Sequence, residues 1–242
     1  MRDLVSILPL RIEGLGFKAD GKALLQDITL DIGRGGLTAL IGPNGAGKSL
    51  LLRLCHGLIQ PCAGRLNWAH GAGFREGRKR HAMVFQKPVM LRRSVRANME
   101  HALRSAGLPR AAVELRGAEA LSRFGLDTLV DRPARVLSGG EQQRLAIARA
   151  WALEPDVLFL DEPCAHLDPG ATGQIETILR GLVAEGVTLV MATHDLGQAR
   201  RLADRVIFLN RGLLVETAEA GEFFAAPKTR EARCFMDGEL LW

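Results

Sequence analysis

The pattern of apolar and polar residues divides the chain into three stretches. Up to about residue 40, the two kinds of residue alternate around GFKADGKALLQDITLDI, which predicts antiparallel strands joined by a turn at Asp20-Gly21. From Lys87 to about Val136, apolar residues recur at helical spacing in SVRANMEHALRSAG and AAVELRGAEALSRFG. After Leu137 come the unbroken apolar runs VLFLDE, VTLVMATHD and RVIFLN, which are typical of a buried parallel sheet.

Shorter elements are expected between these stretches. A hairpin is predicted in GRLNWAHGAGF, and a strand in HAMVF directly after it. The whole pattern predicts an α/β fold with an N-terminal antiparallel β subdomain and an inserted α-helical subdomain.

A glycine-rich segment follows the apolar run that stops at Gly42, in ALIGPNGAGKSLLLRL. Glycines let a backbone turn its N–H groups toward an anion, and a helix that begins near Lys48 adds the positive end of its dipole. Lys48 is placed to reach the outer phosphates of a nucleoside triphosphate, and the Ser49 hydroxyl to ligate Mg²⁺. A glycine-rich turn with a stray lysine is the alternative, which the order strand, loop, helix disfavours. The full match to G-x-x-x-x-G-K-[ST] consists of Gly42, Pro43, Asn44, Gly45, Ala46, Gly47, Lys48 and Ser49.

Two adjacent acids end the apolar run VLFL, at Asp161 and Glu162. Acids at the end of a buried strand are costly unless a positive group compensates them, and a magnesium–nucleotide complex would do so. Asp161 is then placed to hold Mg²⁺ directly or through water, and Glu162 to polarise the attacking water. The alternative is a surface turn with two solvated acids.

A second anion site is predicted at LSGGEQQRLAIARAWAL. Ser138 and Glu141 have the spacing of a capping box, and an amphipathic helix follows them. Gly139 and Gly140 weaken that helix, which makes sense if the backbone comes very close to a ligand. A well-made helix start without a ligand is the alternative.

These motifs resemble those of the ATP-binding cassette (ABC) ATPases, over nearly the whole chain. LSGGEQQR is the signature of that family, and the pair Asp161 and Glu162 resembles its Walker B acids. Gln86 in VFQKP resembles the Q-loop, Asp168 in AHLD the D-loop, and His194 in ATHD the switch histidine.

The resemblance implies a P-loop NTPase with a RecA-like core and a parallel sheet. It makes residues 1–242 a single ABC ATPase domain, with 1–86 and 137–242 as the nucleotide-binding core and 87–136 as the helical insert. ATP and Mg²⁺ are the implied cofactors, and Gln86 joins Ser49 and Asp161 as a metal ligand.

The resemblance also implies a dimer of two copies packed head to tail, with ATP between them. Ser138, Gly139, Gly140 and Glu141 of one copy then face the γ-phosphate held by the other. His194 would contact the γ-phosphate and help to hold the water in line, although a lone histidine after a strand is more often structural.

Three places depart from the family pattern. Leu50 stands where many cassettes carry a threonine that touches the α-phosphate. The ring that usually stacks on adenine falls by register near Ala19, so Phe17 is the candidate substitute. Cys164 and His166 are less usual residues near the D-loop.

Composition restricts the partners and the cellular location that we expect. The chain has 242 residues, 47% of them hydrophobic, and a formal net charge of +5, which favours anionic partners. Four cysteines without C-x-x-C or zinc spacing indicate neither a disulfide framework nor a metal site. The N-terminus does not read as a secretory signal, and no apolar run approaches the roughly twenty residues of a membrane helix. We therefore expect a peripheral protein, held on the cytoplasmic side of the cell membrane by another chain.

The family resemblance is strongest to the energy subunits of importers. An integral membrane permease would dock near 87–100, with Met90, Leu91 and Val95 as the docking surface. Arg92, Arg93 and Arg96 would line its rim or form a solvated face. An extracytoplasmic solute-binding protein would complete the system, and no direct nucleic-acid contact is expected because no aromatic platform accompanies the basic residues.

For cargo, MVFQKPVMLRRSVRANMEHALR resembles tungstate importer cassettes first, with molybdate and phosphate relatives close behind. Two alternatives remain open: an importer cassette for amino acids or another small solute, and a soluble ABC ATPase that acts on nucleic acid or a protein complex.

Overall fold

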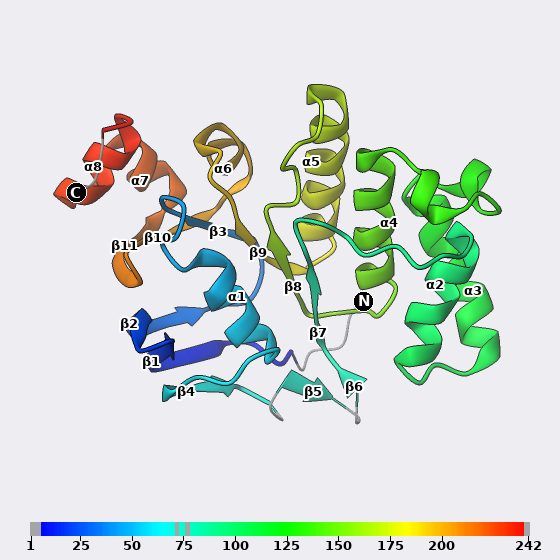
Figure 1. Cartoon of the computed structure of the whole chain (residues 1–242), viewed down its shortest axis with the longest axis horizontal. Helices are drawn as coiled ribbons and strands as arrows, with labels where there is room; N and C mark the ends of the chain where they lie inside the picture. Colours follow the sequence, from blue (N-terminus) through cyan, green and yellow to red (C-terminus); the bar gives the residue numbers. More distant parts are fainter. Residues whose placement is uncertain (1–5, 71–72, 76–77, 240–242) are drawn as a thin grey trace.

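Two large β-sheets, a two-stranded sheet and a set of helices make up the described part of the molecule (Figure 1). The computed structural model describes residues 6–70, 73–75 and 78–239. One sheet has three strands in the order β2-β1-β4, and the other has six in the order β11-β10-β3-β9-β8-β7.

The three-stranded sheet forms the N-terminal layer. Strands β1 (Leu10–Ala19) and β2 (Lys22–Ile32) are antiparallel and joined at Asp20-Gly21, as the alternation predicts. Strand β4 (Ala63–Trp68) pairs antiparallel with β1. The hairpin expected in GRLNWAHGAGF is therefore wrong for its first strand, which pairs with β1. That partner is distant in sequence, and a local pattern cannot specify such a pairing. Two very short strands, β5 (Phe74–Arg75) and β6 (Arg78–Lys79), pair with each other instead. Residues 71–72 of the expected hairpin lie outside the described residues.

The six-stranded sheet is mixed but mostly parallel. Five neighbouring strands run parallel, and β11 pairs antiparallel with β10 at the edge. Every residue of β3, β8 and β9 is buried, because helices or the second sheet cover both faces. The strands are β3 (Leu37–Ile41), β7 (His81–Val84), β8 (Val157–Asp161), β9 (Thr188–Ala192), β10 (Arg205–Asn210) and β11 (Leu213–Glu219).

Alternate residues of these strands enter two different cores. On one face, Phe159 and Val190 pack with helix α1 (Lys48–His56) and with the three-stranded sheet. On the other face, Leu158 and Met191 pack with a second group of helices, which lie on the far side of the sheet from α1 (Figure 1). These helices are α4 (Gly139–Trp151), α5 (Pro169–Ala184) and α6 (Leu196–Leu202), with α7 (Ala220–Ala225) and α8 (Arg230–Met236) near the C-terminus.

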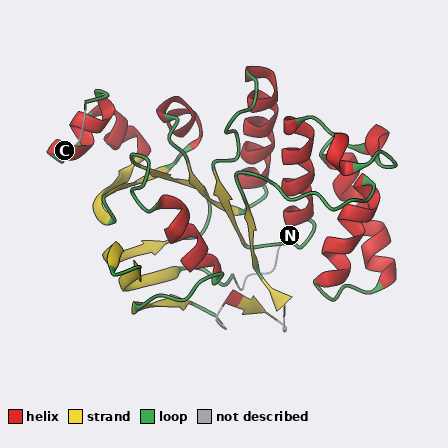
Figure 2. Ribbon diagram, viewed as in Figure 1, coloured by secondary structure: helices red, strands yellow, loops and turns green. Residues whose placement is uncertain are grey.

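Two helices lie in the stretch with helical spacing. Helix α2 (Val95–Ser105) begins at the N-cap Ser94, and α3 (Arg110–Arg123) packs beside it; both also pack on α4 (Figure 2). Two single 3₁₀ turns follow, at Asp127–Leu129 and Ala134–Val136. The boundaries 87 and 136 remain a prediction.

In the described part of the chain, every helix is too short or too polar to cross a lipid bilayer.

The core at Phe159 yields a stability prediction. Its fully buried ring lies edge-on to Trp68 and His81, at centroid distances of 6.5 and 6.1 Å. Phe159→Ala should lower the free energy of unfolding by about 3–5 kcal/mol, because it leaves a cavity between sheet and helix. Urea denaturation measures this change, and Leu58→Ala at an exposed site should stay within about 0.5 kcal/mol of the unmodified chain. Equal losses in the two variants would contradict this packing.

Candidate functional site

The glycine-rich loop lies between β3 and α1. Gly42 has a φ of 145°, and a Cβ there would lie 2.0 Å from the carbonyl oxygen of Leu209. Gly47 has a φ of 101°, and a Cβ there would lie 2.6 Å from Leu25 Cδ2. The loop conformation favours glycine at both positions, and at Gly42 the close Leu209 carbonyl also excludes a side chain. Asn44 and Gly45 are exposed at the tip, and Ala46 is buried beneath it.

Lys48 is a buried cation at the start of α1. Only 6% of the residue is exposed, and its Nζ donates to the carbonyl oxygens of Gly42 at 2.7 Å and Pro43 at 3.0 Å. Burial lowers the pKa of Lys48, whereas the nearby carboxylates of Glu162 and Asp161 act in the opposite direction. The loop therefore holds its own lysine in place, close to the two acids.

Ser49 and Asp161 meet although 112 positions separate them. The Ser49 hydroxyl donates to Asp161 Oδ1 at 2.6 Å, and Asp161 is only 4% exposed at the end of β8. A hydroxyl and a carboxylate provide the hard oxygen ligands that Mg²⁺ prefers. The donor set at this point therefore fits the magnesium ion predicted from the sequence.

Glu162 and His194 form the other contact between strand ends. His194 Nδ1 lies 2.8 Å from Glu162 Oε2, and the side chains are 60% and 14% exposed. Glu162 adopts a φ of +47°, and its N–H donates to the carbonyl of Ala192 at the end of β9. A positive φ is unusual for a residue with a side chain, and such conformations gather at functional sites. The structure therefore brings together the two residues predicted as catalytic.

Gln86 follows β7 at the same edge of the sheet. Strand β7 pairs in parallel with β8 up to Val84 and Leu160, so Gln86 and Asp161 both follow these strand ends. Gln86 is half-buried, and its role as a metal ligand stays a prediction.

The predicted capping box is formed at the N-terminus of α4. The Ser138 N–H donates to Glu141 Oε2 at 2.7 Å, and the Glu141 N–H donates to the Ser138 hydroxyl at 3.3 Å. The next two N–H groups, of Gly139 and Gly140, lack intrahelical acceptors, as in the first turn of any helix. A Cβ on Gly140 would lie 2.8 Å from Ala171 Cβ, so packing against α5 also requires this glycine.

The two anion sites lie on opposite sides of the central sheet. Helix α1 belongs to the core on one face, and α4 to the core on the other (Figure 1). Ser138 and Gly139 are exposed, so the start of α4 is open to another molecule.

Phe17 and Leu50 both pack against the core that contains α1. Each is half-buried there, which gives Leu50 a packing role in place of a polar contact. Stacking of Phe17 on adenine stays a prediction.

A groove of about 750 Å³ opens beside β7, the segment after it, α2 and α4. Val89 is 71% exposed and Phe85 39% exposed on its wall.

The prediction that Met90 and Val95 form a docking surface is wrong, because these residues are 5% and 0% exposed and belong to the core. Leu91 is half-buried and lines the groove. Arg92, Arg93 and Arg96 are exposed.

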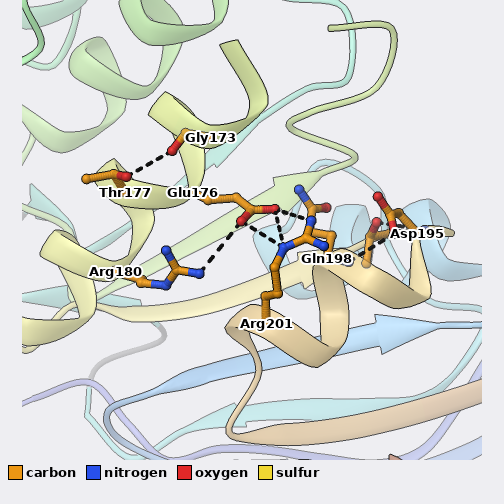
Figure 3. A network of polar contacts seen from close by, with 8 residues as sticks. Gly173, Glu176, Thr177, Arg180, Asp195, Gln198 and Arg201 are labelled. Atoms are coloured by element: carbon orange, nitrogen blue, oxygen red, sulfur yellow. Dashed lines mark hydrogen bonds and ion pairs between the residues drawn. The ribbon is translucent and has the colours of Figure 1, made fainter. Parts of the chain in front are cut away.

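An ion-pair network between α5 and α6 was not predicted. Glu176 lies among the buried residues of α5 and binds Arg201 of α6 (Figure 3). A glutamate on the apolar face of QIETIL is the sequence signal that could have revealed it.

Fold and site together define a P-loop nucleoside triphosphatase. Residues 25–165 match the ABC transporter family. The phosphate import ATP-binding protein PstB 2 of Natronomonas pharaonis is 38% identical over 96% of this chain and 88% of its own length. The methionine import ATP-binding protein MetN of Nocardia farcinica is 41% identical over 88% of this chain and 67% of its own.

A solved structure is similar throughout. CbiO1 of Clostridium perfringens, described as part of the ABC transporter complex cbiONQ, has a TM-score of 0.80 and 33% identity, and covers 90% of each chain. The chain belongs to the ABC transporter family, and it is an ABC transporter ATPase.

The close approach at Gly42 can be tested by substitution. Gly42→Ala should lower the free energy of unfolding by about 3 kcal/mol or more, because both the backbone conformation and the Leu209 carbonyl oppose a side chain. Gly21→Ala is the matched control, since its φ is also positive, at 74°, but nothing lies within 4 Å of the added carbon. It should cost about 1 kcal/mol by chemical denaturation. Similar costs for the two variants would show that Leu209 does not constrain the loop.

Proposed function

We propose that the chain is the energy-coupling subunit of an ABC importer, in which hydrolysis of ATP drives a membrane permease. The observation that carries this proposal is the meeting of Lys48, Ser49, Asp161, Glu162 and His194 at one end of the central sheet. The names of the similar import proteins support the direction of transport.

Each residue at this edge has a proposed task. The N–H groups of residues 42–49 and the Lys48 ammonium bind the β- and γ-phosphates. Ser49, Asp161 and Gln86 would hold Mg²⁺, which neutralises charge on the phosphates. Glu162 orients and polarises the attacking water, and His194, within reach of Glu162, contacts the γ-phosphate. Positioning and charge stabilisation of this kind are most of what phosphoryl transfer requires.

The site is completed by a second copy of the chain. The start of α4 is exposed and lies across the sheet from α1, which supports contact with a nucleotide held by another molecule. Ser138, Gly139, Gly140 and Glu141 would then approach the γ-phosphate from the partner. ATP joins the two copies, and hydrolysis lets them separate.

The permease docks in the groove beside residues 87–100. Its exposed apolar wall at Phe85 and Val89 suits an apolar segment of another protein. Through this contact the chain works at the cytoplasmic side of the membrane, with a solute-binding protein on the other side. The assembly of CbiO1 in a transporter complex supports such a partnership.

For cargo, we propose an inorganic oxyanion. The phosphate import relative supports this class, although it gives no specific support to tungstate, which the sequence phrase favoured, or to molybdate. The methionine import relatives make an amino acid the second candidate. A binding assay of the cognate solute-binding protein with tungstate, molybdate, phosphate and methionine distinguishes these cargoes.

Removal of the Glu162 carboxylate tests the catalytic assignment. Glu162→Gln should bind ATP with unchanged affinity but hydrolyse it about a hundred- to a thousandfold more slowly. Equilibrium nucleotide binding and steady-state phosphate release measure the two quantities. Turnover close to that of the unmodified chain would remove Glu162 from the catalytic role.

A charged group in the groove tests the permease surface. Val89→Asp should abolish co-purification with the permease, because burial of an unpaired carboxylate against an apolar partner is costly. Leu115→Asp is the matched control, since Leu115 is 72% exposed but lies on α3 outside the groove, and it should leave the complex intact. If Val89→Asp still retains the permease, the groove is not the docking surface.

A further inference from the structure

Helices α5 and α6 are joined by a buried carboxylate and an arginine. Glu176 is only 5% exposed, and both of its oxygens accept hydrogen bonds from the Arg201 guanidinium (Figure 3). Arg201 Nη2 lies 2.6 Å from Glu176 Oε1, and its Nε lies 3.1 Å from Oε2. Arg180, one turn further along α5, is a weaker neighbour with its Nη2 3.7 Å from Oε2.

Glu176 is buried but the Arg201 side chain is 49% exposed, so stability is a weak account of this pair. Removing a carboxylate from water is costly, and an apolar pair of similar size often serves a fold equally well. Glu176 lies on a face of α5 where Ile175, Leu179 and Leu182 are buried. The pair restrains the relative position of α5 and α6, because a planar guanidinium that bonds both carboxylate oxygens restricts how the two helices pack.

Each helix follows one of the proposed catalytic residues along the chain. After Glu162 the chain makes a short loop and enters α5 at the N-cap Asp168. After His194 it enters α6 at once, with Asp195 as N-cap accepting from the Gln198 N–H at 2.9 Å. A shift of α6 relative to α5 would therefore be transmitted directly to His194.

A second contact joins α6 to the loop that follows Glu162. The Gln198 side chain of α6, 2% exposed, lies beside the Cys164 thiol in the loop after Glu162. Burial raises the pKa of Cys164 to about 11, so the thiol is neutral at physiological pH and packs as a small apolar group. Helix α6 is thus in contact with the loop after Glu162 through Gln198 and Cys164, and it is joined to α5 by the ion pair.

We propose that the Glu176–Arg201 pair is a positioning element for His194: it fixes α6 on α5 and so keeps His194 Nδ1 within 2.8 Å of Glu162 Oε2. The inference rests on the proposed function of Glu162 and His194 in hydrolysis. Neither Glu176 nor Arg201 is among the residues proposed to bind the nucleotide, and the pair acts on the rate only through the histidine.

The test compares Arg201→Met with two other variants of the full chain in steady-state ATP hydrolysis. Arg201→Met should lower kcat about tenfold, while the KM for ATP stays within about twofold because the phosphate loop packs on the other face of the sheet. Arg201→Lys keeps the charge but loses the two-pronged contact, and it should fall between the unmodified chain and Arg201→Met. Arg180→Met is the matched control, since it removes the weaker arginine without separating the helices, and its kcat should be unchanged.

Combination with His194→Ala separates positioning from general damage. If Arg201 acts through His194, then Arg201→Met should reduce kcat about tenfold in the unmodified chain and not at all in the His194→Ala background. Equal reductions in both backgrounds would overturn the inference, as would an unchanged kcat in Arg201→Met. Thermal unfolding of each variant shows that the compared chains are folded at the assay temperature, and Arg201→Lys provides the comparison if Arg201→Met is not.

Hydrolysis by His194→Ala distinguishes a failure of the proposed function from a failure of the positioning role. If His194→Ala hydrolyses ATP at the normal rate, the proposed role of His194 is wrong and the positioning role falls with it. If His194→Ala is slow while Arg201→Met has the kcat of the unmodified chain, the proposed function stands and only the inference is overturned.

Discussion

The site depends on one buried charge. The Lys48 ammonium is removed from water and held by two carbonyl oxygens of its own loop, close to the carboxylates at the end of β8. A buried cation loses its hydration, and here the carbonyl oxygens and the nearby carboxylates compensate part of that loss. The hydrogen bond from Ser49 to Asp161 ties the start of α1 to the end of β8, so the charges face one another in a fixed arrangement. A magnesium–triphosphate complex has the charge distribution that fits between them.

The proposal that the chain acts in pairs rests on the central sheet. It separates α1, with the glycine-rich loop, from α4, whose start at Ser138 and Gly139 is exposed. A helix start that is capped by its own serine and glutamate, yet has an exposed Gly139 and two further N–H groups without intrahelical acceptors, is suited to an anion supplied from outside the chain. The same sheet edge bears Glu162 and His194, and the helices that follow them are joined by Glu176 and Arg201.

Sequence reasoning was strongest where local chemistry determines the outcome. The glycine loop, the capping box and the apolar strands were predictable, because each needs particular residue types at short spacing. The pairing of β4 with β1 was not, since strand partners distant in sequence leave no local pattern. The sequence does not show that Met90 and Val95 are buried, because apolar residues near a loop can face either solvent or the core. Only the packing shows that both enter the core. The contact between Glu176 and Arg201 depends on how two helices lie together, 25 positions apart.

The most direct test of the central claim is the mass in solution of the Glu162→Gln chain with saturating ATP and magnesium, by analytical ultracentrifugation. The account predicts a species of twice the 26.3 kDa chain mass. It also predicts that the further substitution Ser138→Arg, at the exposed start of α4, returns the protein to single chains. A Glu162→Gln chain that binds nucleotide fully but stays single, both alone and in complex with its permease, would contradict it.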